Sequence, residues 1–91
     1  MTRPVKRSLT IAGHRTSVSL EDAFWDALRE IAETRGIGMA ALVTEIDRAR
    51  ALEPGEATGL ATAIRLHVLA HFRARASEAA ARSPDGASSD P

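Results

Sequence analysis

Apolar and polar side chains alternate over two short stretches near the N-terminus. The alternation covers residues 6–11 and 15–20, where the apolar or β-branched positions are Leu9, Ile11, Thr16, Val18 and Leu20. A period of two predicts extended strands that have one apolar face and one polar face. The intervening Ala12-Gly13-His14 is either a turn between two strands or a bulge within one. The pattern leaves open whether residues 6–14 form a second strand or a flexible arm.

A helix is predicted directly after the strands, over about residues 22–35. Its apolar residues recur at spacings of three and four, which places them on one face of the helix. Ser19 is expected to cap the start of this helix, with Asp22 as its capping-box partner. Gly36 is expected to end the helix as its C-cap.

Two further helices are predicted in the C-terminal half of the chain. The second covers about residues 39–51, and a loop signal at Pro54-Gly55 follows it. The third covers about residues 59–76, with Thr58 as its expected cap. The apolar band of the third helix is wide, which favours a buried or subunit-facing position.

These elements predict a mostly α-helical domain with a short β ribbon, because 91 residues allow one small domain. Residues 1–5 are expected to be a flexible N-terminus, residues 6–76 the domain, and residues 77–91 a disordered tail. No internal repeat is apparent. A lone strand has no partner for its backbone groups, and a lone ribbon is marginal in water. A second copy of the chain is therefore expected to supply the matching strand.

Composition excludes several classes of protein. Hydrophobic residues make up 44% and charged residues 26%, as in soluble globular proteins. The absence of cysteine removes disulfides, thiolate zinc sites and cysteine nucleophiles. No apolar run approaches the roughly 20 residues of a membrane span, and no apolar stretch of signal-peptide length follows the first cations. A cytoplasmic protein with no membrane partner is therefore expected.

Charge is distributed unevenly along the chain. The formal net charge is zero, yet the first 20 residues contain no acid and hold the cations Arg3, Lys6, Arg7 and Arg15. All twelve acids follow this segment. Such an asymmetry predicts a local positive surface, and the alternative is a short solvated basic arm.

The run RTSVSLEDAFWDALREIAETRGIGMAALV resembles the ribbon-helix-helix domain of Arc- and MetJ-type bacterial repressors. The shared pattern is a short alternating strand, Ser-Leu-Glu at the junction, a helix, Arg-Gly-Ile-Gly and a second helix. The N-terminal string KRSLTIAGHRTSVSLEDAFWDAL is more specific, because it resembles a group of short uncharacterised bacterial proteins that carry this domain. The resemblance covers about residues 6–75.

The resemblance implies an intertwined dimer with an additional C-terminal helix. Strands from two chains would pair into an antiparallel ribbon that enters the DNA major groove, where its outer face reads base edges. Arg15, Ser17 and Ser19 match the base-reading positions, and Gly38 and Met39 match the helix start that holds a phosphate. The run LATAIRLHVLAHFRA also resembles the second helix of the family, so either later helix can fill that role.

The resemblance also suggests roles for the remaining basic and apolar residues. Lys6 and Arg7 are expected to contact phosphates or bases. For Trp25 the alternatives are ordinary core and burial across the interface between two chains, and the second is favoured because tryptophan is enriched at interfaces. The expected dimer core consists of Val18, Leu20, Phe24, Trp25, Leu28, Ile31, Leu42, Ile46, Ile64 and Val68.

The sequence gives little support for a catalytic site or a metal site. His67 and His71 have the i, i+4 spacing of metal ligands, but no cysteine and no H-E-x-x-H motif accompany them. A structural or surface role, or a subunit contact tuned near neutral pH, is favoured for this pair. Glu45 and Asp47 have no accompanying nucleophile or glycine-rich loop, so a solvated helix face is expected. The sequence therefore predicts no enzyme, no cofactor and no metal.

The leading hypothesis is a homodimeric, sequence-specific DNA-binding protein that represses transcription by inserting its ribbon into the major groove. Its partner would be double-stranded DNA, with assembly above the dimer on DNA. One alternative is an antitoxin whose tail folds on a toxin, which would require a protein partner. Another is a dimeric protein-interaction module without DNA binding. An Arg15→Ala change separates the regulator from the interaction module.

Overall fold

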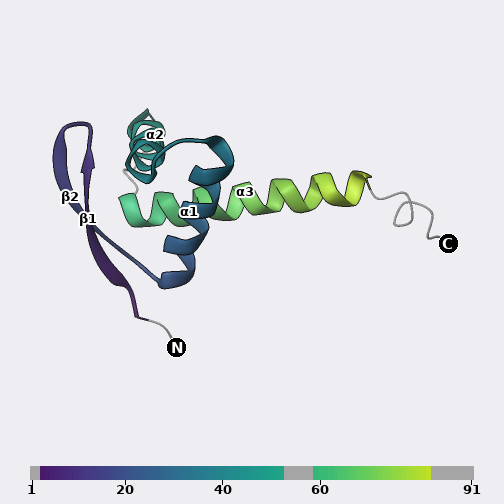
Figure 1. The fold of residues 1–91 in the computed structure, drawn as a ribbon, viewed down its shortest axis with the longest axis horizontal. Coiled ribbons are helices and arrows are strands. Elements are labelled where there is room, and N and C mark those ends of the chain that lie inside the picture. Colours follow the sequence, from purple (N-terminus) through teal and green to yellow (C-terminus); the bar gives the residue numbers. More distant parts are fainter. Residues whose placement is uncertain (1–2, 53–58, 83–91) are drawn as a thin grey trace.

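The fold is a two-stranded ribbon followed by helices. A computed structural model describes residues 3–52 and 59–82. Within these residues the elements in chain order are β1 (Val5–Ile11), β2 (His14–Leu20), α1 (Asp22–Arg35), α2 (Met39–Leu52) and α3 (Leu60–Arg82). The ribbon lies on one side of the helices, and the far half of α3 extends beyond the rest of the fold (Figure 1). The mostly helical class with a short ribbon is confirmed.

β1 and β2 pair with each other as an antiparallel hairpin of one chain. The register places Val5 opposite Leu20 and Ile11 opposite His14, so the connection is the two residues Ala12 and Gly13. Both connecting residues have positive φ, 52° and 84°, as the tight hairpin turn of type I′ requires. This resolves the open choice in favour of a turn. Within one chain β1 supplies the matching strand for β2, and the expected pairing with a second copy stays a prediction.

The alternation along each strand separates the ribbon into two faces. Ile11, Val18 and Leu20 point to the helices and are buried, while Leu9 and Thr16 on the same face are half-buried. Because successive residues of a strand point to opposite sides, the polar positions between them face outward. The predicted apolar and polar faces are thus confirmed on both strands.

Helix α1 begins and ends close to the predicted positions, with a different cap at its start. Glu21, not Ser19, is the N-cap, and no side chain caps the helix. The Ser19 prediction is wrong because β2 continues through Leu20, so Ser19 still belongs to the strand. At the other end Gly36 adopts the left-handed conformation (φ 69°) and donates to the Glu33 carbonyl oxygen. Ile37 donates to the Ala32 carbonyl oxygen, which completes a Schellman cap.

Helices α2 and α3 lie close to their predicted ranges, but α3 is longer. It continues to Arg82, so the expected disordered tail is wrong for residues 77–82. The segment 77–82 reads SEAAAR, and its three alanines are strong helix formers. Thr58, the predicted cap, lies outside the described residues, as do residues 83–91 of the predicted tail. Val5, placed in the flexible N-terminus, is already part of β1.

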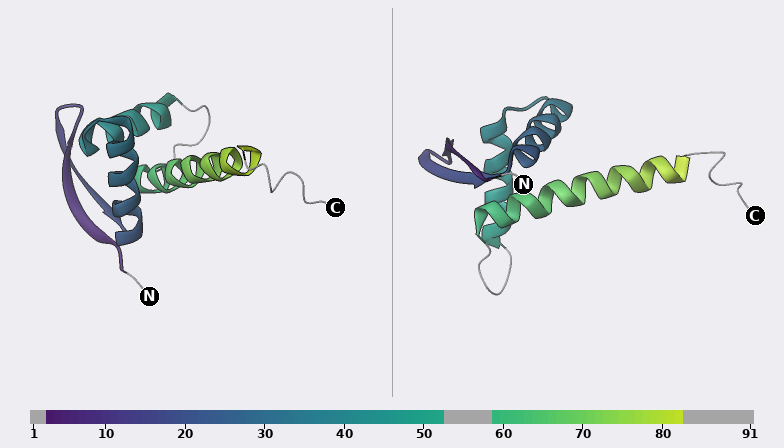
Figure 2. Two further views of the ribbon diagram at one scale, coloured as in Figure 1. Left: turned by 45° about the vertical axis from the view of Figure 1, so that its right-hand side comes forward. Right: turned by 90° about the horizontal axis from the view of Figure 1, so that it is seen from below.

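The core forms between the inner face of the ribbon and all three helices (Figure 2). Nine of the ten residues predicted for a dimer core are buried within the single chain, and Phe24 is half-buried. Trp25 is 1% exposed, so its expected burial across an interface between chains is wrong for this structure. Ile11, Ala32 and Val43 also belong to this core. One chain therefore encloses its own apolar residues.

Candidate nucleic-acid interface

The outer face of the ribbon gathers polar side chains from both strands. Five of its six members are exposed and Ser19 is half-buried. Lys6 lies opposite Ser19, Ser8 opposite Ser17, and Thr10 opposite Arg15. We call this set the outer ribbon face: Lys6, Ser8, Thr10, Arg15, Ser17 and Ser19.

The outer ribbon face carries positive charge without compensation. Its two cations, Lys6 and Arg15, make no ion pair with the part of the chain that the structure describes. Neither strand contains an acid. The four hydroxyls between the cations donate and accept hydrogen bonds. Exposed cations and hydroxyls on a ribbon suit contact with phosphates and base edges.

Arg7, which the sequence analysis predicts to contact DNA together with Lys6, lies on the opposite face of the ribbon. Its guanidinium carbon is 5.0 Å from the centre of the Trp25 ring, within the range of a cation–π contact. The register places it opposite Val18, whose side chain is in the core. The structure therefore does not bring Arg7 to the outer ribbon face.

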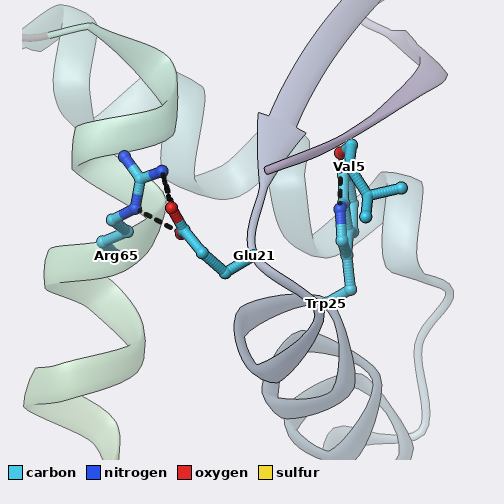
Figure 3. Close-up of polar contacts among 4 residues, drawn as sticks. All are labelled: Val5, Glu21, Trp25 and Arg65. Carbon is cyan, nitrogen blue, oxygen red and sulfur yellow. Dashed lines mark hydrogen bonds and ion pairs between the residues drawn. The ribbon is translucent and has the colours of Figure 1, made fainter. Parts of the chain in front are cut away.

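A hydrogen bond attaches the start of the ribbon to α1. The indole Nε1 of Trp25 donates to the carbonyl oxygen of Val5 at 2.9 Å (Figure 3). Val5 is the first residue of β1 and pairs with Leu20, the last residue of β2. The buried indole thus holds the open end of the hairpin against the first turns of α1.

An ion pair attaches α3 to the junction between the ribbon and α1. Arg65 Nε lies 3.0 Å and Nη2 3.2 Å from the two carboxylate oxygens of Glu21 (Figure 3). The same guanidinium lies 5.7 Å from the centre of the Phe24 ring. Hydrogen bonding to the backbone amide of Glu21, followed by the bond from Arg65, holds the pKa of the Glu21 carboxyl below its ordinary value.

Gly38 and Met39 lie at the start of α2, outside the outer ribbon face. The Gly38 carbonyl oxygen accepts the first intrahelical bond, from Leu42 N–H at 3.1 Å. Gly38 is exposed and Met39 is half-buried. The first backbone N–H groups of an α-helix have no partner within the helix and favour an anion. The predicted phosphate-holding residues are thus at a helix start, as the resemblance requires.

The histidine pair of α3 lies away from the ribbon. No group of three potential metal ligands occurs among the described residues. The Nε2 atom of His71 is buried and has no hydrogen-bond partner within them. Burial lowers the pKa of His67, and the neighbouring His71 and Arg35 lower it further, whereas Glu45 raises it.

The sequence interpretation missed two groups of residues. Ser8 and Thr10 belong to the outer ribbon face, and their alternation with Leu9 and Ile11 already indicated it. Glu21 and Arg65 are 44 residues apart, and nothing local in the sequence pairs them. Their contact exists only because α3 packs beside the ribbon–α1 junction.

Comparison with known proteins agrees with the observed fold. Residues 4–72 match the family described as the ribbon-helix-helix domain, a segment that includes the first half of α3. One solved structure, an uncharacterized protein from Bordetella pertussis Tohama I, has 32% sequence identity and a TM-score of 0.67. That match covers 94% of this chain and 66% of the other chain, so this chain spans just under two thirds of that protein's length. Among curated proteins, none matches the chain.

Two further findings bear on the class of protein. None of the described helices is long and apolar enough to cross a membrane. Proteins with a ribbon-helix-helix domain are generally DNA-binding regulators or antitoxins. The family match covers three quarters of the sequence, and the fold is a hairpin with helices packed behind it. The chain therefore belongs to the ribbon-helix-helix domain family.

Proposed function

We propose that this protein is a sequence-specific DNA-binding regulator of transcription that inserts its β1–β2 ribbon into the major groove. The observation that carries the proposal is the outer ribbon face, which contains no acid and combines four hydroxyls with two cations that make no ion pair within residues 3–52 and 59–82. A two-stranded ribbon fits the width of the major groove of B-DNA. The family to which the chain belongs supports the same role.

The side chains of the outer ribbon face differ in how strongly they can discriminate between bases. Arg15 and Lys6 can each donate two hydrogen bonds to O6 and N7 of guanine, a contact worth about 1–3 kcal/mol of discrimination. The hydroxyls of Ser8 and Ser17 can donate or accept, so they discriminate less between bases. A ribbon bound over a promoter would repress by excluding the polymerase. This role places the protein in the cytoplasm, where a bacterium holds its DNA.

The start of α2 has a second, supporting part in the proposed complex. The free N–H groups that follow Gly38 would hold a backbone phosphate beside the groove. Such a contact positions the protein on the duplex without carrying sequence information. The proposed role is binding rather than catalysis, and it requires no cofactor.

Assembly of two copies belongs to the proposal as well. Leu66 and Leu69 project from α3 and are 57% and 53% exposed, which supports an apolar contact between copies. Each copy would bring its own complete ribbon, because the hairpin closes within one chain. A dimer would then place two ribbons on two successive half-sites, and further dimers could bind side by side.

The test is binding of the full chain to a pool of random duplex DNA, followed by fluorescence anisotropy at low and moderate salt. We expect affinity that falls as salt rises, because bound cations release counterions from DNA. Arg15→Ala should weaken binding about tenfold or more. Arg48→Ala removes the same charge from an exposed position on α2 and should change affinity little.

Two results would contradict the proposal. One is a folded chain that does not bind duplex DNA even at low salt, which would favour a protein-interaction module. The other is equal loss of affinity in Arg15→Ala and Arg48→Ala, because a general charge effect would then explain the binding. Light scattering of the same samples reports the number of chains, free and on DNA.

A further inference from the structure

We infer that the exposed side of α3 binds the same side of α3 in a second copy, that the two helices are antiparallel, and that this contact links two separate segments of DNA. The inference rests on the proposed DNA-binding function for its consequence, the link between duplexes. The contact itself is argued from α3 alone. It also gives a place to the wide apolar band of this helix, which only one side of the core covers.

The exposed side of α3 carries a regular line of residues. Its members are separated alternately by four and three positions, which is the spacing that paired helices use for the residues between them. All of them are exposed, and on the helix they lie opposite to the buried Ile64 and Val68. Two of them, Leu66 and Leu69, are large hydrophobic residues. We call this set the outer α3 stripe: Thr62, Leu66, Leu69, Arg73, Ala76 and Ala80.

The spacing along the outer α3 stripe is the same from either end. Its intervals are four, three, four, three and four residues, so the stripe is symmetric about residue 71. His71 is also the middle residue of α3, because eleven residues of the helix precede it and eleven follow it. Two copies of α3 placed antiparallel about this residue therefore overlap over their whole length. Each position of one stripe then meets a position of the other.

Side-chain sizes are complementary in this antiparallel arrangement. Leu66 meets the partner's Ala76, and a leucine opposite an alanine allows two helices to approach closely. Leu69 meets the partner's Arg73, whose aliphatic stem can cover the leucine while its guanidinium stays in water. In a parallel arrangement Arg73 would instead meet the partner's Arg73. The stripe therefore fits a second copy of itself in the antiparallel direction.

Charge favours the same direction. Residues 73–82 are all exposed and carry three arginines and one glutamate, which is a net charge of +2. In residues 60–72 the charge of Arg65 is balanced by Glu21. A parallel pair would bring two basic halves together, whereas an antiparallel pair places each basic half beside a neutral one. The half of α3 that extends beyond its own fold thereby contacts the attached half of the partner helix.

The direction of α3 decides where the two ribbons lie. The helix begins beside the ribbon and extends away from it (Figures 1 and 2). An antiparallel partner runs the opposite way, so the two outer ribbon faces lie at opposite ends of the pair and point away from each other. The ends are separated by about 35 Å, the length of α3. Binding to successive half-sites needs ribbons that face the same way, so the α3 contact adds a link between duplexes to that arrangement.

The size of the contact predicts a weak link. The stripe is about 27 Å long and a helix is about 10 Å wide, so each copy contributes a strip of about 270 Å². Two strips amount to about 540 Å², below the roughly 1,000 Å² of a stable interface. We therefore expect the link to form where several copies are concentrated on DNA, because many weak contacts then act together.

Disulfide trapping tests the pairing and its direction, because the chain has no cysteine of its own. The variants Thr62→Cys and Ala80→Cys change the two ends of the stripe and leave both leucines in place. A mixture of the two variants, oxidised on random duplex DNA, should give a cross-linked dimer that neither variant forms alone. Ala79→Cys is the matched control, because residue 79 lies on the same side of α3 as Val68 and should not cross-link with Thr62→Cys.

Two outcomes of the trapping experiment would overturn the inference. Cross-linking of Thr62→Cys with itself would show a parallel pair. A mixture that gives no more dimer than the Ala79→Cys control would show that the stripes do not meet.

Capture of one duplex by another tests the consequence. One copy of a duplex selected for binding is attached to beads, and a labelled copy is added with the full chain. The wild type should retain the label, and Leu66→Gln/Leu69→Gln should reduce retention about tenfold or more, because the apolar contact is lost. Leu52→Gln is the control, since Leu52 is exposed on α2, outside the stripe. Equal retention by the double variant and the wild type would overturn the inference.

Anisotropy with one duplex separates this inference from the proposed function. The double variant should keep the affinity of the wild type within about twofold, because the stripe is distant from the outer ribbon face. Loss of this affinity together with retention would overturn the inference, since α3 would then serve the binding of a single duplex. A wild type that binds no duplex would overturn the proposed function instead. Trapping of free copies at high protein concentration would still test the pairing.

Discussion

Trp25 is a buried side chain of α1 that anchors the start of the ribbon. A large amphipathic ring on a helix of a small, alanine-rich protein indicates burial, and the indole is buried. Its partner is the chain's own ribbon, because Nε1 reaches the Val5 carbonyl oxygen. A buried indole N–H needs an acceptor, and the start of β1 supplies one.

Substitution of Trp25 by phenylalanine tests this anchor. Trp25→Phe keeps an apolar ring and removes the hydrogen bond to Val5, so the free energy of unfolding should fall by about 1–3 kcal/mol. Urea denaturation followed by circular dichroism measures the change. Phe24→Leu is the matched control, because Phe24 is only half-buried and donates no hydrogen bond. An equal or larger loss in Phe24→Leu would show that the indole bond does not anchor the ribbon.

His67 predicts a dependence of stability on pH. Its pKa in the folded chain lies below the ordinary value of 6.5, mainly because of burial. Protonation therefore favours the unfolded chain, so this stabilising contribution is present above pH 6.5 and is lost as pH falls. In the His67→Gln variant, stability should fall less steeply as the pH drops below 6.5. Thermal unfolding at a series of pH values measures it, with the exposed His14→Gln as control. Identical pH profiles for wild type and His67→Gln would contradict the prediction.

At the scale of elements, the hairpin is the part of the fold that most needs support from its surroundings. A two-stranded ribbon alone is marginal in water. Here its inner face covers the helices and its open end is attached to α1. The turn is not optimal, because Ala12 adopts a positive φ of 52°, a conformation that is unfavourable for alanine.

The turn provides a stabilising substitution. Ala12→Asn creates Asn-Gly, the preferred sequence for a type I′ turn, and should raise the free energy of unfolding by about 0.5–1 kcal/mol. Ala12→Val should lower it, because a β-branched residue disfavours positive φ more strongly. The urea midpoints of the two variants, compared with that of the wild type, test both predicted changes in stability. A stabilising valine would show that the hairpin turn differs from the one described.

At the scale of the whole molecule, α3 is joined to the rest of the fold over its first half only. Ile64 and Val68 are its buried residues, and residues 73–82 are exposed. The far half of α3 extends away from the other elements (Figure 2). The ion pair between Arg65 and Glu21 lies in the attached half and spans 44 residues of sequence. It therefore connects the C-terminal helix with the point at which the ribbon meets α1.

This ion pair predicts an acid-dependent contribution to stability. The pKa of Glu21 lies below its ordinary value of 4.5, so the contribution is present above that pH and is lost as pH falls through the lowered pKa. Arg65→Met should lower Tm at neutral pH, and its difference from the wild type should narrow in acid. Calorimetry at several pH values measures both. Arg73→Met, an exposed position on α3, should leave Tm unchanged at every pH. A constant difference for Arg65→Met would contradict the prediction.

Local patterns predicted the elements well because each depends on neighbouring residues. Period-two alternation indicated β2 and assigned Arg15, Ser17 and Ser19 to its polar face, but it left β1 open between a strand and a flexible arm. Gly36 indicated the end of α1, because only a residue that tolerates positive φ suits that cap. Ser19 failed as a cap because the strand pairing extends to Leu20, and pairing depends on residues far from the helix start.

The sequence by itself determined the strand that contains Arg15, the apolar and polar faces of the alternating segments, the helix boundary near Gly36 and the cations of the acid-free first 20 residues. It could do so because periodicity, caps and charge are local properties. Only the tertiary structure decided that β1 pairs with β2 of the same chain, that Trp25 anchors this ribbon and that Arg65 reaches Glu21. These contacts join segments that no local signal relates. They arise because the ribbon must pair its backbone groups and cover its apolar face, and the helices of the same chain provide the surface on which it can do so.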